Sequence, residues 1–151
     1  IDILQEKMDF AKQLGAQQVF NAEDSSVIEK VKNFIANGVD YSFECVGSEK
    51  SMELAYKILK RGGTAVSSGL SHPDKSFSIP HVDMVAGEKI IKGSFLGSCV
   101  PGRDIPAYID LYNSGNMPVD RLMSDHIDLE EINEGFEKLS AGTTVRQVIM
   151  F

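Results

Sequence analysis

The stretch Val39-Asp40-Tyr41-Ser42-Phe43-Glu44-Cys45-Val46-Gly47 decides the fold class of this chain. Its side chains alternate between apolar and polar as they do in a β-strand, and Gly47 ends the run. Apolar residues at helical spacing precede it in residues 27–34 and follow it in residues 52–59. A strand enclosed by two amphipathic helices in this way indicates an α/β protein.

Two shorter strand-like runs, residues 18–20 and 64–68, extend this pattern. A helix predicted over residues 5–14 precedes the first run, and Gly62-Gly63 separates the second run from the helix before it. Strands and helices that alternate through short connections are typical of a parallel sheet with helices on both faces. The sequence therefore predicts a doubly wound parallel sheet with right-handed crossovers.

Polar residues mark the starts of the predicted helices. Ser26 and Glu29 have the spacing of a capping box, ahead of a helix whose predicted buried face is Val27, Val31 and Phe34. Either Ser48 or Ser51 can cap the following helix.

The regular alternation of predicted strands and helices ends at Gly69. A short extended piece at 76–80 and a helical turn at 81–86 precede a predicted strand at 88–95. A helix is expected to start near 101–104. A last helix begins at a capping box formed by Asp128 and Glu131 and ends at Gly142, and residues 145–151 form a terminal strand.

Composition excludes several classes of function. The chain has 151 residues, of which 42% are hydrophobic and 25% charged, as in an ordinary globular domain. Its apolar runs are too short for a membrane span. A net charge of -7 disfavours nucleic acid as a partner, because phosphate binding needs a basic patch. Two cysteines far apart in sequence make a disulfide framework improbable and favour a reduced, cytoplasmic setting.

The opening residues Ile1-Asp2-Ile3 resemble the end of a strand that runs into a helix. In a dinucleotide-binding βαβ unit, an acidic residue at this point binds the ribose hydroxyls. The glycine-rich phosphate turn of such a unit lies about 20 residues before that acid. We therefore expect the chain to begin partway through a cofactor-binding domain.

Two further segments, 44–47 and 68–70, end predicted strands with a glycine. In a doubly wound sheet, ligands bind outside the carboxyl ends of the strands. Each segment alone is most simply a turn. Together with Asp2 they outline a possible dinucleotide groove.

Several blocks of the sequence, in this order, resemble zinc-dependent alcohol dehydrogenases of the medium-chain dehydrogenase/reductase superfamily. They are residues 2–7, 11–16, 38–47, 61–64, 91–94, 132–136 and 145–148. The resemblance implies a Rossmann sheet that lacks its first βα unit in residues 1–95. It implies that residues 96–151 are a C-terminal segment that packs on a catalytic domain absent from this chain. Apolar faces of the last helix and strand would then be exposed.

The resemblance also implies which residues bind the cofactor. Asp2 and Lys7 would contact the adenosine ribose of NAD, and the charge of Asp2 would repel the extra phosphate of NADP. Residues on the adenine side would be Cys45, Val46 and Gly47. Residues beside the nicotinamide would be Ser68, Gly69 and Leu70. The main chain of Ser94 and Leu96 would hold the carboxamide, and Arg146 the pyrophosphate.

The resemblance implies no catalytic residue and no zinc ligand within this chain. We expect His72, His81 and His126 to be polar surface residues. The zinc of the intact enzyme, and its proton relay, would be held by residues that precede this chain in the family.

Three interpretations of function stay open at this point. The first is NAD-dependent, zinc-assisted oxidation of an alcohol to an aldehyde or ketone, and the reverse, by the intact enzyme. The second is a zinc-free medium-chain reductase of the quinone or enoyl reductase type. The third is a non-catalytic Rossmann module that only dimerises. The family further implies a homodimer or tetramer formed through the edge strand at residues 89–95.

Overall fold

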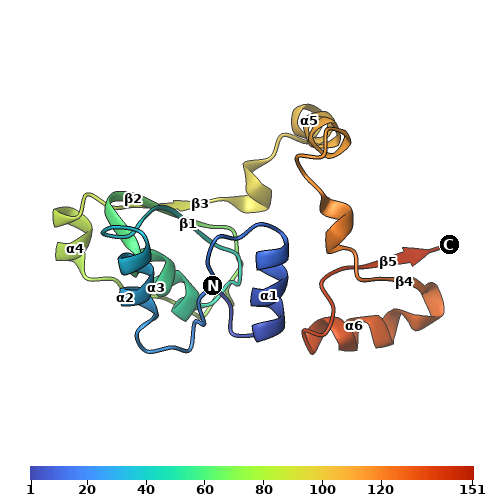
Figure 1. Cartoon of the computed structure of the whole chain (residues 1–151), viewed down its shortest axis with the longest axis horizontal. Helices are drawn as coiled ribbons and strands as arrows, with labels where there is room; N and C mark the ends of the chain where they lie inside the picture. Colours follow the sequence, from blue (N-terminus) through green and yellow to red (C-terminus); the bar gives the residue numbers. More distant parts are fainter. The chain divides into compact units, whose positions relative to one another are not determined.

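The computed structural model describes residues 1–151, which divide into two compact units, Ile1–Ser98 and Cys99–Phe151 (Figure 1). None of the helices is both long enough and apolar enough to cross a lipid bilayer.

The first unit is built on a three-stranded parallel sheet in the order β1-β2-β3. Its strands are β1 (Val39–Glu44), β2 (Leu59–Ser67) and β3 (Ile90–Gly93), and its helices are α1 (Gln5–Gln13), α2 (Val27–Phe34), α3 (Glu49–Lys57) and α4 (His81–Ala86), followed by the short helix η1 (Phe95–Ser98). Glu44 pairs in register with Ser67, and Ser67 with Gly93, so the three strands end at the same edge. The predicted parallel α/β sheet is confirmed.

Two apolar clusters form the core of this unit. One contains Met52 and Tyr56 of α3 with Leu59 and Ala65 of β2. The other contains Val27 and Val31 of α2 with Ile58, the residue that follows α3. The two clusters hold α2 and α3 to the strands.

An ion pair between a buried lysine and a half-exposed aspartate holds α4 in place. The Lys89 side chain is only 7% exposed, and its Nζ lies 3.0 Å from Asp83 Oδ2. The same ammonium group lies 4.6 Å from the centroid of the Tyr56 ring, a cation–π contact to α3.

The strand predicted at residues 18–20 is reduced to a single parallel bridge between Asp2 and Asn21. The Asp2 amide donates to the Phe20 carbonyl at 3.2 Å, and the Ala22 amide donates to the Asp2 carbonyl at 3.0 Å. Neither segment makes the further rungs that would define a strand.

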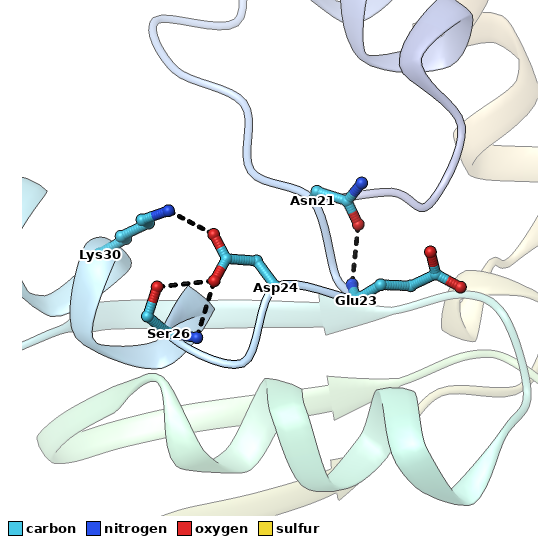
Figure 2. A network of polar contacts seen from close by, with 5 residues as sticks. All are labelled: Asn21, Glu23, Asp24, Ser26 and Lys30. Atoms are coloured by element: carbon cyan, nitrogen blue, oxygen red, sulfur yellow. Dashed lines mark hydrogen bonds and ion pairs between the residues drawn. The ribbon is translucent and has the colours of Figure 1, made fainter.

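The predicted capping box of Ser26 and Glu29 is wrong, because Asp24 takes its place (Figure 2). Asp24 Oδ1 accepts hydrogen bonds from the Ser26 amide at 2.8 Å and the Ser26 hydroxyl at 2.6 Å, and Oδ2 pairs with Lys30. The Lys30 ammonium and then the Ser26 hydroxyl and amide hold the pKa of Asp24 well below its usual range. Phe34 is also less buried than predicted, at 49% exposed, and packs edge-on against Phe20.

Strand β2 begins five residues earlier than the sequence predicts, at Leu59 rather than residue 64. The pairing of β1 with β2 shifts register between Val39 and Tyr41, and Gly62 adopts a φ of +74°. The Gly62-Gly63 pair is therefore an irregularity within the strand and not its boundary. Strand β3 is shorter than predicted, because Glu88 takes a φ of +49° before it and Phe95 enters η1 after it.

The second unit contains α5 (Pro101–Asn113), η2 (Val119–Leu122), β4 (Asp125–Asp128), η3 (Leu129–Glu131), α6 (Ile132–Ser140) and β5 (Gln147–Met150). Strands β4 and β5 pair in parallel, with Ile127 beside Ile149. The predicted capping box is confirmed, because the Asp128 amide donates to Glu131 Oε2 at 2.9 Å. Gly135 lets α6 approach the sheet, since a Cβ there would lie 2.8 Å from Ile127 Cδ1.

The helices of the second unit leave apolar side chains exposed, as the sequence predicted for its last helix. Phe136 and Leu139 of α6 are 62% and 50% exposed, and α5 has no buried residue. Strand β4 was not predicted, because three of its four residues are polar and hide the pattern of a strand.

Gly38 and Gly15 offer a matched test of backbone packing. Both have a φ near +110° (+110° and +106°), but a Cβ at Gly38 would lie 2.4 Å from the Ile58 carbonyl oxygen, whereas a Cβ at Gly15 meets nothing within 4 Å. We expect Gly15→Ala to lower the free energy of unfolding by about 1–3 kcal/mol through backbone strain alone. Gly38→Ala should lower it by roughly a further 1–3 kcal/mol, because the start of β1 must move away from Ile58. Urea denaturation of both variants measures the difference, and equal losses would contradict this account.

Candidate functional site

The carboxyl ends of β1 and β2 lead into two loops, residues 45–47 and 68–70, whose backbones touch. A Cβ on Gly69 would lie 2.2 Å from the Gly47 nitrogen, and a Cβ on Gly47 would lie 2.4 Å from the Leu70 carbonyl oxygen. Gly47 also has a φ of +80°, a conformation that favours glycine. Side chains at either glycine would push the loops apart.

The carboxylate of Glu44, the last residue of β1, lies at the centre of this edge. Its Oε1 accepts hydrogen bonds from the amides of Val46 and Gly47 and from the Ser51 hydroxyl, each at 2.7 Å. Its Oε2 accepts from the Ser67 hydroxyl at 3.1 Å. The residue is 4% exposed, so these protein donors replace water around the charge.

The main chain of Glu44 holds the second loop. Its carbonyl oxygen accepts hydrogen bonds from the amides of Ser68 at 2.8 Å and Gly69 at 3.2 Å. The Ser68 hydroxyl also lies 3.3 Å from this carbonyl oxygen. Glu44 is therefore bonded to both loops, through its side chain to one and through its main chain to the other.

Burial by itself would raise the pKa of Glu44, but the hydrogen bonds that its carboxylate accepts outweigh burial. Those from Ser51, Gly47, Val46 and Ser67 together lower the pKa of Glu44 below its ordinary value of 4.5. The side chain is thus held as an anion at neutral pH.

Six of the predicted cofactor-binding residues lie together in these loops. They are Cys45, Val46, Gly47, Ser68, Gly69 and Leu70. Val46 and Leu70 are 78% and 79% exposed, so the edge presents apolar side chains to solvent. The Ser68 hydroxyl lies 3.3 Å from Cys45 Sγ.

Ser94 belongs to the same edge, because its amide donates to the Ser67 carbonyl at 2.8 Å. Leu96 follows two residues later with a φ of +48° and is 77% exposed. The third strand thus contributes two more of the predicted residues near the same strand ends.

Asp2 and Lys7 lie at the start of the chain, one before α1 and one within it. Asp2 Oδ1 accepts hydrogen bonds from the amides of Ile3 at 2.8 Å and Leu4 at 3.0 Å. These bonds fix the direction of the carboxylate and use only one of its oxygens. Both residues are half-buried, and no hydrogen bond connects them to the loops at 45–47 and 68–70.

Arg146 belongs to the second unit, just before β5. Ser124 holds its backbone: the Ser124 amide donates to the Arg146 carbonyl at 2.7 Å, and the Ser124 hydroxyl accepts from the Arg146 amide at 3.3 Å. Arg146 lines a hollow of about 280 Å³ whose other walls include Ile127, Phe136 and Ile149. Its predicted contact with a pyrophosphate stays a prediction.

A separate hollow of about 470 Å³ lies between residues 18–21 and α2. Its lining includes Phe20, and also Asn21, Asp24 and Lys30, which belong to the polar contacts that Figure 2 shows. No residue of the two strand-end loops contributes to it.

The chain contains no group of three or more His, Cys, Asp or Glu side chains placed to hold a metal ion. His72 faces Asp74 at 3.4 Å on an exposed loop, and Cys45 and Cys99 are free thiols. The side chains present therefore do not fit a zinc site.

The sequence interpretation missed the roles of Glu44, Ser51 and Ser67. In β1 the polar residues Ser42 and Glu44 are buried, whereas Tyr41 and Phe43 are 65% and 72% exposed. An acidic residue at the end of a strand, directly before a glycine-ended loop, is the signal that could have indicated a buried hydrogen-bond acceptor.

Residues 1–114 match the family described as zinc-binding dehydrogenase. The chain belongs to this family. Over 153 residues it is 31% identical to the NDMA-dependent alcohol dehydrogenase of Amycolatopsis methanolica, covering 99% of this chain and 41% of the relative. Over 156 residues it is 28% identical to alcohol dehydrogenase class-3 of Drosophila melanogaster, covering 100% of this chain and 41% of that protein.

The fold agrees with solved zinc-binding dehydrogenase relatives. Benzyl alcohol dehydrogenase from Acinetobacter calcoaceticus superposes with a TM-score of 0.94 at 28% identity, covering 98% of this chain and 41% of that one. This chain therefore spans about two fifths of the length of its relatives. The predicted resemblance to zinc-dependent alcohol dehydrogenases is confirmed, as is the class of its fold.

The lowered pKa of Glu44 predicts a pH-dependent contribution to stability. Because the folded protein binds the Glu44 proton less tightly than the unfolded chain, this contribution is complete above the ordinary pKa and is lost as pH falls through the folded pKa. We expect Glu44→Gln to lower the free energy of unfolding by roughly 1–3 kcal/mol at neutral pH. The deficit should shrink as pH falls below the ordinary value of 4.5, because the unfolded chain takes up this proton first and the folded protein takes it up only at lower pH.

Denaturation of both proteins across this pH range measures the effect. Glu29→Gln, which alters an exposed glutamate on α2, is the control and should change stability little. A Glu44→Gln deficit that stays constant with pH would contradict the assignment.

Proposed function

We propose that the intact protein is an NAD-dependent alcohol dehydrogenase and that this chain supplies its cofactor-binding edge. The observation that carries the proposal is the pair of touching loops at the carboxyl ends of β1 and β2, with exposed Val46 and Leu70 beside them. Parallel α/β sheets bind ligands at this edge. The relatives named above are alcohol dehydrogenases, and the proposed reaction is inferred from them.

Each part of the edge has a proposed task in holding the cofactor. Residues 45–47 would contact the adenine side, and residues 68–70 the nicotinamide and its ribose. The main chain of Ser94 and Leu96 would hold the carboxamide and so set which face of the ring meets the substrate. Arg146 belongs to the second unit and not to this edge; the resemblance to the family alone assigns it to the pyrophosphate, a task suited to its forked and permanently charged side chain.

Asp2 and Lys7 would select NAD over NADP. The bonds from the Ile3 and Leu4 amides direct the Asp2 carboxylate while its Oδ2 stays available to ribose hydroxyls. A carboxylate in this position would repel the extra phosphate of NADP. Lys7 would provide a second contact to the same ribose.

A bound nicotinamide would accept a hydride from the alcohol carbon while the hydroxyl proton is released to solvent, so that the alcohol becomes an aldehyde or ketone. The residues of this chain would bind and orient that ring. We assign no zinc ligand here, because the side chains present do not form a metal group. No catalytic residue is assigned to this chain either. Zinc dependence of the intact enzyme stays a prediction, as do its cytoplasmic location and its division into residues 1–95 and 96–151.

We further propose that the protein forms a homodimer, or a tetramer containing that dimer, through the free edge of β3. Strand β3 pairs only with β2, so its other edge has unpaired main-chain groups. Ile90 at the start of β3 is 53% exposed, and Phe95, which begins η1 after the strand, is 71% exposed. Exposed apolar edge strands favour pairing with another chain, and a two-fold axis pairs the edge with its own copy.

The variant Asp2→Asn tests cofactor selection without disturbing the fold. Asparagine keeps an oxygen that can accept from the Ile3 and Leu4 amides but lacks the charge. We expect NAD to bind about tenfold more weakly to the intact protein, since hydrogen bonds to charged groups are stronger than those to neutral ones. The preference for NAD over NADP should narrow at the same time.

Fluorescence titration of both cofactors measures these changes. Asp9→Asn is the control: it removes an acidic charge from α1, where Asp9 accepts a hydrogen bond from the Gln5 side chain. It should leave the affinities for NAD and NADP unchanged. A wild-type protein that binds neither cofactor would overturn the proposed function. A preference for NADP would favour a reductase of the quinone or enoyl type.

The variant Ile90→Lys tests the dimer. A lysine at this exposed edge position would bring like charges together across a two-fold axis. We expect the mass measured by light scattering to fall to that of a smaller assembly. Val82→Lys alters a side chain of α4 that is 74% exposed and should leave the assembly intact. A wild-type monomer would remove this proposal.

A further inference from the structure

We propose that Glu44 is a positioning residue for the cofactor: its carboxylate and carbonyl hold the loops 45–47 and 68–70 at a fixed separation. This inference rests on the proposed function, because it is these two loops that would enclose the cofactor. Glu44 itself is 4% exposed, so it acts through the loops and not by touching the ligand.

The donors to the Glu44 carboxylate come from three different elements. The amides of Val46 and Gly47 belong to the first loop, the Ser51 hydroxyl to the start of α3, and the Ser67 hydroxyl to the end of β2. Movement of the first loop away from the strand ends would break bonds to a buried anion. Such bonds are costly to lose, because the anion has no water to replace them.

The start of α3 is part of the same network. Ser51 and Ser48 form a reciprocal capping box, with the Ser51 amide donating to the Ser48 hydroxyl at 3.1 Å. The Ser51 hydroxyl, which donates to Glu44, therefore also belongs to the cap of the helix. Glu44 thus couples the first loop to α3 as well as to β2.

Other direct links between the two loops are weak or depend on close packing. The hydroxyl of Ser68 lies 3.3 Å from Cys45 Sγ, and sulfur is a weak acceptor. The backbones of Gly47 and Gly69 touch without hydrogen-bonding to each other. Glu44 therefore provides the main directional bonds that fix one loop relative to the other.

Both the charge and the length of Glu44 are needed for this geometry. Glutamine has the same length but no charge, so its bonds to the amides and hydroxyls are weaker. Aspartate keeps the charge but is shorter by one methylene, so its oxygens cannot reach the two amides and the Ser51 and Ser67 hydroxyls at the same time. The two variants separate these requirements.

The test measures cofactor affinity and amide hydrogen exchange in the intact protein, for Glu44→Gln and Glu44→Asp. We expect each variant to raise the NADH dissociation constant about tenfold, the scale of a lost charged hydrogen bond. Exchange in the ligand-free protein should become faster in residues 45–47, whose amides lose their carboxylate partner, and less so in residues 68–70, which keep the Glu44 carbonyl as acceptor.

Ser42→Ala is the matched control. Ser42 is buried on the same strand, and its hydroxyl donates to the Ala55 carbonyl at 2.8 Å, away from both loops. This variant should lower stability yet leave the NADH dissociation constant within about twofold of wild type, since surface loops that it does not touch keep their positions. An equal rise in Ser42→Ala would assign the effect to general destabilisation and overturn the inference.

The two readouts separate failure of this inference from failure of the proposed function. If wild-type protein binds NADH but neither Glu44 variant alters affinity or loop exchange, the positioning role is wrong and the function stands. If wild-type protein binds no dinucleotide, the proposed function is wrong, and with it the role of Glu44 in cofactor binding. Faster exchange in residues 45–47 would still establish that the Glu44 carboxylate holds the first loop at the strand ends.

Discussion

A buried carboxylate at the end of β1 is the constraint on which the strand-end edge depends. Glu44 cannot remain charged away from water unless several donors surround it, and the donors available are the next loop, the start of α3 and the end of β2. Satisfying one side chain therefore brings three elements together. The main chain of the same residue then holds the loop after β2.

This polar constraint works with a steric one. Gly47 and Gly69 allow the two loops to touch, since a Cβ on Gly69 would lie 2.2 Å from the Gly47 nitrogen. Hydrogen bonding draws the loops together and the missing side chains permit the contact. The result is a compact edge with exposed apolar residues in a protein of the zinc-binding dehydrogenase family, consistent with the proposed role of holding a flat cofactor.

Sequence patterns correctly predicted the helix caps and the strand whose defining interactions join residues a few positions apart. The cap at Ser48, the box at Asp128 and Glu131, and the alternation in β1 all depend on residues a few positions apart, and each is present in the structure. The capping box predicted for Ser26 and Glu29 is absent, because the Ser26 amide donates to the carboxylate of Asp24, two residues earlier, and not to Glu29. Strand β4 was missed because its polar residues conceal a pairing with β5 about 20 residues later.

The sequence by itself determined the α/β class, the parallel sheet, the resemblance to alcohol dehydrogenases and the two loops that contain Gly47 and Gly69. These follow from periodicity, turn chemistry and short motifs, which are properties of neighbouring residues. Only the tertiary structure decided that Glu44 is buried while Tyr41 and Phe43 are exposed, because alternation along a strand does not say which face is covered. One donor to this buried charge, the Ser67 hydroxyl, lies 23 residues further along the chain, and only the packing of β2 against β1 brings it within hydrogen-bonding distance.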